Sequence, residues 1–186
     1  NTSLNARQIE ILIKLNYFKR YGDVHKLLDV FSAFREGPSR YAKTYKGATK
    51  EKRLAFLREM EANWNGKQST PYELARYQVE ITGSVLGKFD VPPNRYVILD
   101  VDARYSAKIT LYNLSRGTSG TIKMKKPMFH AIGAKVGDTI HIVQWCNRPR
   151  YSFEDGKPKP IPGTSEKWIL DAYVVESNDI AELAAI

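Results

Sequence analysis

Basic and aromatic side chains are concentrated in one stretch of the chain, residues 104–126. This stretch contains six Lys or Arg residues and neither Asp nor Glu. An aromatic ring that stacks on a nucleobase contributes roughly 1–3 kcal/mol, and lysines beside it can neutralise phosphates. The pattern therefore predicts a surface that binds nucleic acid. Its residues would be Arg104, Tyr105, Lys108, Tyr112, Arg116, Lys123 and Lys125.

Two other segments interleave bases with aromatics in a similar way. The first is residues 147–165, rich in Pro and Gly, which we expect to form a long surface loop. It contains Arg148, Arg150 and Tyr151, and Trp145 lies just before it. The second is residues 39–49, which contain no acid. This segment is either a solvated loop or a loop that contacts phosphates. Its candidate contacts are Arg40, Tyr41 and Lys43.

A catalytic site would need other residue types at defined spacings. Asp100 and Asp102 are two residues apart, so on a strand both carboxylates point the same way and could bind metal ions for phosphoryl chemistry. No third carboxylate with a suitable spacing supports this, and acids at a strand end explain the pair better. His25, His130 and His141 are scattered without a metal-ligand spacing. We therefore predict no catalytic residues, metal or cofactor.

Five segments in the second half have the apolar pattern of strands, four of them alternating with a period of two. They are residues 95–102, 105–114, 121–125, 139–146 and 168–176, with a short helix over 128–133. This β-β-β-α-β-β order is that of an OB-type barrel. The alternation predicts core positions at Ile109, Leu111, Ile122 and Met124, and an outer face carrying Lys108, Tyr112, Lys123 and Lys125.

The first half has helical periodicity instead. Helices are expected over residues 5–20, from Asp23 to the Gly37-Pro38 stop, after Thr49, and from the Thr70-Pro71 start signal to Gly83. The Pro-Pro joint over residues 91–94 suggests a domain boundary near residue 90. The predicted class is α+β. Its domains would be a helical domain over 1–90, an OB-like five-stranded barrel over 91–177, and a short helix or tail over 178–186.

Composition limits the classes of protein further. The 186 residues carry a net charge of +9, which favours a polyanionic partner. There is no apolar run of 18 residues and no secretory signal at the start, so we expect no membrane association. The single cysteine, Cys146, excludes an internal disulfide and favours a reducing, cytoplasmic location.

Several short motifs follow one another in a recognisable order. Residues 12–18 read Leu-Ile-Lys-Leu-Asn-Tyr-Phe, then come Tyr21-Gly22 and a Lys-Leu-Leu helix at 26–28. Residues 77–83 read Tyr-Gln-Val-Glu-Ile-Thr-Gly, and strand-like segments follow at 108–112 and 135–140. Together they resemble the C-terminal region of bacterial replicative DNA polymerase III alpha subunits. The leucine-glycine and histidine-proline pattern of that family is absent around Gly83, so the chain would be a divergent member.

The resemblance implies a role in DNA replication for a fragment that spans the end of the fingers, a helical segment and the OB domain. The fragment would bind single-stranded template DNA, with the sliding clamp or other replisome proteins as further partners. The parent would be a nucleotidyltransferase, but the family's catalytic aspartates lie far upstream in its palm. None is carried onto Asp100 or Asp102, and the fragment is expected to be non-catalytic.

Two other functions remain open from the residues alone. The barrel could be a docking module that binds a replisome protein and no DNA. Alternatively, the chain could be a free-standing nuclease or transferase that uses Asp100 and Asp102.

Overall fold

The chain consists of two compact units that meet between Thr70 and Pro71. The structure is a computed structural model that describes residues 4–36 and 40–175. Helices occupy the first unit and a barrel the second, which confirms the predicted α+β class. The division comes about twenty residues before the boundary predicted near residue 90. The helix or tail predicted over 178–186 lies outside the described residues.

The described residues of the first unit form four helical segments. They are α1 (Ala6–Lys14), η1 (Lys19–Tyr21), α2 (Val24–Arg35) and α3 (Gly47–Ala62). A capping box starts α1, since the Asn5 side chain accepts from the Gln8 N–H and the Gln8 side chain accepts from the Asn5 N–H. The helix expected over 5–20 is shorter, because Asn16 adopts the left-handed conformation, with φ of 59°.

A carboxylate at the start of α2 ties the end of this unit back to the helix. Asp23 caps α2 by accepting from the His25 N–H, at 2.8 Å. The same side chain accepts from the backbone N–H of Ser69 at 3.0 Å and from its hydroxyl at 2.5 Å. The expected start of α2 at Asp23 is thus correct, whereas α3 begins at Gly47, two residues before the expected start at Thr49.

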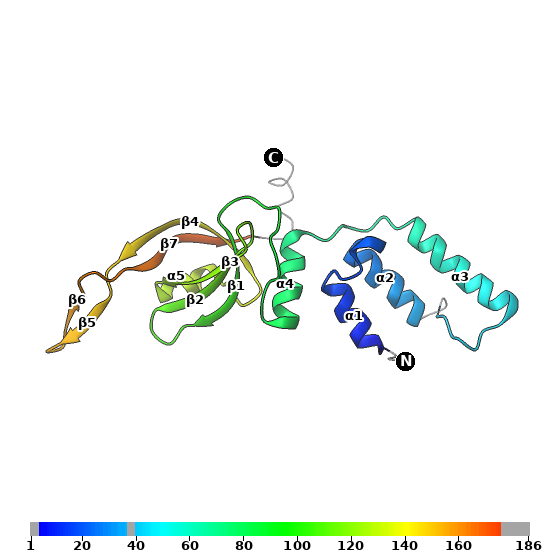
Figure 1. Ribbon diagram of the computed structural model, residues 1–186, viewed down its shortest axis with the longest axis horizontal. Coiled ribbons are helices and arrows are strands. Elements are labelled where there is room, and N and C mark those ends of the chain that lie inside the picture. Colours follow the sequence, from blue (N-terminus) through cyan, green and yellow to red (C-terminus); the bar gives the residue numbers. More distant parts are fainter. Residues whose placement is uncertain (1–3, 37–39, 176–186) are drawn as a thin grey trace. The chain divides into compact units, whose positions relative to one another are not determined.

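In its described residues, the second unit begins with a helix and continues as a barrel (Figure 1). The strands form a closed barrel in the order β1-β2-β3-β7-β4, with β3 and β7 parallel and the other pairs antiparallel. This order and the helix between β3 and β4 agree with the predicted OB-like barrel. The elements are α4 (Pro71–Thr82), β1 (Arg95–Asp102), β2 (Ala107–Asn113), β3 (Thr118–Met124), α5 (Lys126–Ile132), β4 (Thr139–Arg148) and β7 (Glu166–Val174).

The interior of the barrel is the larger of two hydrophobic clusters. All four predicted core positions of β2 and β3 are buried there. They pack with Ile140 and Ile142 of β4 and with Ile169 of β7. The period-two pattern therefore identified the inner face of these strands correctly.

The second hydrophobic cluster lies between α4 and the outside of the barrel. Tyr72, Ala75 and Val79 of α4 pack there against strands β1 and β2. Tyr112 belongs to this cluster, and its hydroxyl donates to the Gly87 carbonyl oxygen at 2.6 Å. Tyr112 lies on the outer face of β2 as predicted, but it is not free to bind a ligand there, because α4 and the segment after it cover this part of β2. The same cluster explains why α4 belongs to the barrel unit.

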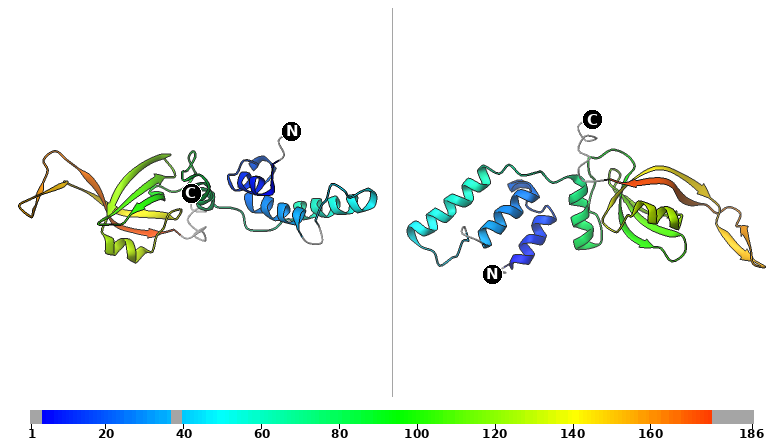
Figure 2. Two further views of the ribbon diagram at one scale, coloured as in Figure 1. Left: turned by 90° about the horizontal axis from the view of Figure 1, so that it is seen from below. Right: turned by 180° about the vertical axis from the view of Figure 1, so that it is seen from behind.

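Strands β4 and β7 continue beyond the barrel into a hairpin arm (Figures 1 and 2). This hairpin pairs β5 (Tyr151–Glu154) with β6 (Lys157–Pro160) and falls within the surface loop predicted over 147–165. Its turn is Asp155-Gly156, with φ of 49° and 71°, the left-handed values of a type I′ turn. Among the described residues, no helix has the length and apolar character needed to cross a membrane.

The buried position of Tyr112 leads to a stability prediction. The Tyr112→Phe variant should lose about 1 kcal/mol of unfolding free energy, because the Gly87 carbonyl loses its hydrogen bond. The Tyr112→Ala variant should lose about 3–5 kcal/mol, because it leaves a cavity in the second cluster. Urea unfolding followed by circular dichroism measures both. If Tyr112→Ala unfolds like the parent, α4 does not pack on β2 in solution.

Candidate nucleic-acid interface

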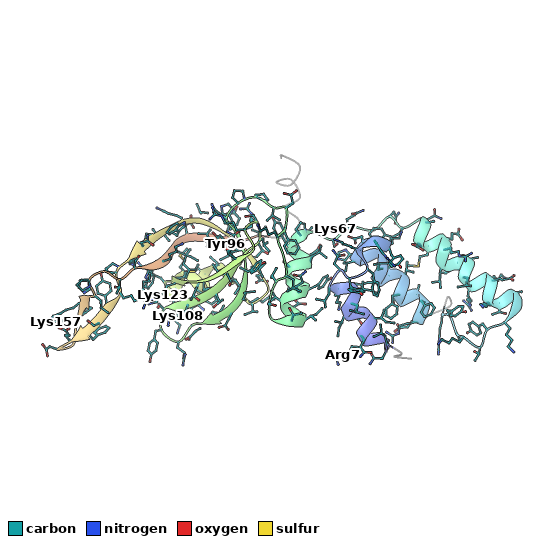
Figure 3. All side chains as sticks on the ribbon, in the orientation of Figure 1. Arg7, Lys67, Tyr96, Lys108, Lys123 and Lys157 are labelled. Carbon is teal, nitrogen blue, oxygen red and sulfur yellow. The ribbon has the colours of Figure 1, made fainter. Side chains whose placement is uncertain are left out.

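One row of five side chains runs across the outside of the barrel. Lys108 on β2 is the register partner of Asp102 on β1 and of Lys123 on β3. Lys123 is in turn the partner of Trp168 on β7, and Trp168 is the partner of Cys146 on β4. Because partners in a sheet project to the same face, all five share the outer surface. Lys108 and Lys123, which were predicted to share the outer face, are register partners there, and both are labelled on the barrel in Figure 3.

A groove of about 820 Å³ lies over this row. Thr110 and Thr121, which are partners on β2 and β3, line its floor beside the two lysines. Arg150, Tyr151 and Ile161 line it from the segment that leads into and out of the hairpin arm. Four cationic side chains line the groove, Lys108, Lys123, Arg150 and Lys167, against three carboxylates, Asp100, Asp102 and Glu166.

The Glu166 carboxylate holds the middle of the row together. One oxygen is 2.7 Å from Nζ of Lys123, and the other accepts from Nε1 of Trp168 at 3.0 Å. Burial raises the pKa of Glu166, but the hydrogen bonds from Lys123 and Trp168 outweigh it and keep the pKa below its usual value. Lys123 and Arg148 also lie over the Trp168 ring, 5.5 and 5.3 Å from its centroid. Trp168 therefore sits in a cationic environment.

The two aspartates of β1 form the acidic border of the groove. Asp102 receives hydrogen bonds from the side chain and backbone of Arg104, which lower its pKa to about 2. Asp100 lines the same groove. No group of three or more His, Cys, Asp or Glu that could hold a metal ion occurs in residues 4–36 and 40–175.

The groove lies between two connecting segments. Arg104 and Tyr105 belong to the β1–β2 connection, where the Tyr105 ring is 88% exposed. Arg150 and Tyr151 lie at the start of the hairpin arm, in the connection between β4 and β7. In OB folds, the face of the second and third strands and these two connections are the parts that bind oligonucleotides and oligosaccharides.

Several predicted residues lie outside the groove. Arg116 and Trp145 line a separate pocket at the mouth of the barrel, and Lys125 is exposed at the N-terminus of α5. Tyr112 is buried, as described above.

The remaining predicted contacts belong to the first unit. Arg40 and Lys43 are exposed, and the Tyr41 ring stacks on Phe34 with centroids 5.3 Å apart. The Tyr41 ring is thus already in an aromatic pair within its own unit.

Sequence reasoning did not single out Trp168, Lys167 or Glu166. The period-two pattern around the buried Ile169 places Trp168 on the outer face, so this signal was present. The contact of Lys123 with Glu166 had no such signal, because it depends on the pairing of β3 with β7, which are more than forty residues apart in the chain.

Comparisons of this chain with protein-family models, with curated proteins and with solved structures found no match.

The Lys123–Glu166 pair should make the stability of the fold depend on pH in the acid range. A carboxylate whose pKa is lowered by folding stabilises the fold above its unfolded-state pKa, roughly 4.3 for Glu. This contribution should disappear as the pH falls from that value through the lower pKa of the folded state. The Glu166→Gln variant should therefore lose less stability than the parent over this acid range. Thermal unfolding at a series of pH values measures the difference, and parallel curves for the two proteins would contradict it.

Proposed function

We propose that the barrel unit binds single-stranded nucleic acid in the groove across β1, β2, β3 and β7. The phosphates would lie along Lys108, Lys123 and Arg150. Exposed bases would stack on Tyr151 at the start of the hairpin arm. The observation that carries the proposal is the paired position of Lys108 and Lys123 on the floor of a groove that has an aromatic residue at its border.

The geometry suits a single strand better than a duplex. Stacking on a side chain requires the face of an unpaired base, and the aromatic ring available for it projects from the edge of the groove. Tyr151 is 54% exposed there. The net charge of +9 adds long-range attraction for a polyanion, which raises the rate of association.

The motifs that resemble DNA polymerase III alpha subunits supply a biological setting for this activity. In that setting the chain is the C-terminal part of a replicative polymerase, and its barrel guides the single-stranded template in the cytoplasm. The sliding clamp or other replisome proteins would be additional partners. The chain itself would hold DNA, while the chemistry would belong to a palm domain elsewhere in the parent.

One observation favours the alternative of a protein-docking module. Asp100, Asp102 and Glu166 offset much of the positive charge in the groove, and a surface of mixed charge suits a protein partner. Binding measurements with nucleic acid separate the two functions, because a docking module would show no oligonucleotide binding that depends on the groove lysines.

The lysine pair gives the first test. In the Lys108→Ala/Lys123→Ala variant, the slope of log affinity against log salt for a single-stranded oligonucleotide should flatten by roughly 0.7 per lost phosphate contact. Fluorescence anisotropy over a salt series measures the slope. A matched control is Lys19→Ala/Arg20→Ala, which removes two exposed charges from the first unit. Equal slopes for the groove variant and the parent would reject the groove as the binding site.

The aromatic border gives the second test. Tyr151→Ala should weaken binding of the same oligonucleotide by roughly 1–3 kcal/mol, because one stacked base is lost, and should leave the salt slope unchanged. Tyr151→Phe keeps the ring and should bind like the parent. Ser152→Ala, on the opposite face of the hairpin arm, is the neighbouring control. The proposed stacking fails if Tyr151→Ala and Ser152→Ala have the same affinity.

A further inference from the structure

Strands β3 and β7 contact each other over a short distance only. Their register pairs are Lys123 with Trp168 and Met124 with Ile169. In the described residues, the part of β3 from Thr118 to Ile122 has no register partner on the β7 side. The first four residues of β3 are all exposed, although alternate residues of a barrel strand normally face a filled interior. The barrel wall is therefore open beside the first half of β3.

A pocket of about 290 Å³ occupies the barrel mouth at this opening. Its floor is apolar and includes Leu111, Ile122 and Ile142. Trp145, 48% exposed, and Asn113 contribute to its lining. The Asn113 side-chain oxygen accepts from the Ser115 hydroxyl and the Arg116 N–H, so the group that Asn113 offers a ligand is its NH₂ donor.

A glycine at an inward-facing position explains why this pocket is empty of side chains. Gly120 is two residues before the buried Ile122 and is the register partner of the buried Leu111, so a side chain there would point into the barrel. A Cβ at Gly120 would meet no atom within 4 Å, and its φ lies outside the left-handed range. Neither backbone conformation nor close packing requires glycine here. What glycine does provide is the volume of the pocket.

The pocket and the groove meet at the opening, because Thr121 and Lys167 line both. Lys167 Nζ lies 4.8 Å from the centroid of the Trp145 ring, so its ammonium group is placed between the two sites. We propose that the pocket receives one unpaired base from a strand bound in the groove, with Lys167 on the adjoining phosphate. This inference rests on the proposed binding of single-stranded nucleic acid and adds a site that reads the base itself.

The pocket has the chemistry that a single base needs. Its volume lies near the lower end of the roughly 300–1,000 Å³ of small-molecule sites, which suits one planar ring system. The apolar floor accommodates the ring, the Trp145 indole provides a stacking surface, and the Asn113 NH₂ can donate to a base carbonyl. A duplex could not use the pocket, because its bases are paired and stacked inside the helix.

The decisive variant fills the pocket and leaves the groove intact. Gly120→Val adds a side chain into open space on a strand, where valine is well tolerated, so its melting temperature should match or exceed that of the parent. The probes are a fluorescein-labelled oligothymidylate of roughly 16 nucleotides, the upper limit for one OB fold, and an abasic strand of the same length. Anisotropy gives the ratio of their two dissociation constants.

For the parent, the oligothymidylate should bind more tightly than the abasic strand. Gly120→Val should reduce this ratio by roughly 5- to 150-fold, the range expected for loss of one stacked base. Trp145→Ala should reduce the ratio by a similar factor, because this variant removes the indole ring on which the base would stack and leaves the pocket unfilled. Val143→Ala, an exposed position on the same strand as Trp145, should leave the ratio unchanged. Affinity for the abasic strand should stay at the parental value in Gly120→Val and Val143→Ala, which leave Lys167 and the Trp145 ring beneath it unchanged.

Each other outcome has a defined meaning. If the folded Gly120→Val and Trp145→Ala variants keep the parental ratio, the pocket does not hold a base. The inference is then overturned. A pocket that binds a peptide side chain in place of a base would give this same result. If Lys108→Ala/Lys123→Ala still flattens the salt slope in that experiment, the proposed function survives alone. If the parent shows no salt-dependent binding of either strand, the proposed function and the inference fail together.

Discussion

The short contact between β3 and β7 is the constraint on which the rest of the barrel unit depends. Two register pairs, Lys123 with Trp168 and Met124 with Ile169, close the cylinder. The first pair points outward and continues the row of side chains whose Asp102, Lys108 and Lys123 line the groove, while the second points inward and completes the core. Because the strands pair over so few residues, the wall beside Thr121 stays open. A longer ladder would have given a tighter barrel with neither the opening nor the pocket behind it.

Carboxylates in the groove offset most of its positive charge, so contacts with bases are needed for tight binding. Glu166 engages Lys123 at 2.7 Å, and Arg104 engages Asp102 at 2.8 Å, so two of the candidate phosphate ligands already have a counter-charge. A phosphate that approaches Lys123 must compete with a carboxylate that folding keeps ionised. Such an arrangement weakens purely electrostatic binding of any polyanion. It leaves a larger share of the binding energy to stacking, which distinguishes an unpaired strand from other polyanions.

The period-two alternation of residues 95–176 was sufficient to predict the strand order, the inner face of β2 and β3, and the outward pair Lys108 and Lys123. It placed Tyr112 on the correct outer face but could not show that the residue is buried, because alternation describes only which face a residue occupies and α4 covers part of that face. The domain boundary was misplaced for the same reason: α4 looks helical like the segments before it, but its apolar residues pack on the barrel. The Glu166 contacts and the barrel-mouth pocket depend on pairing between distant strands, which no local pattern encodes.

In the hairpin arm, prolines limit strand pairing at the β6 edge beside an exposed aromatic face. Tyr151 and Phe153 project to one face and remain 54% and 76% exposed, opposite Pro160 and Pro158. Since Pro has no N–H, these two must occupy the positions of the ladder that make no hydrogen bond to β5, and their nitrogens face the free edge of β6. That edge therefore lacks donors at two alternate positions, so another strand cannot extend the sheet there. Strand addition is therefore hindered at the β6 edge, while the aromatic face of the arm stays open. An open aromatic face suits a ligand that binds by stacking.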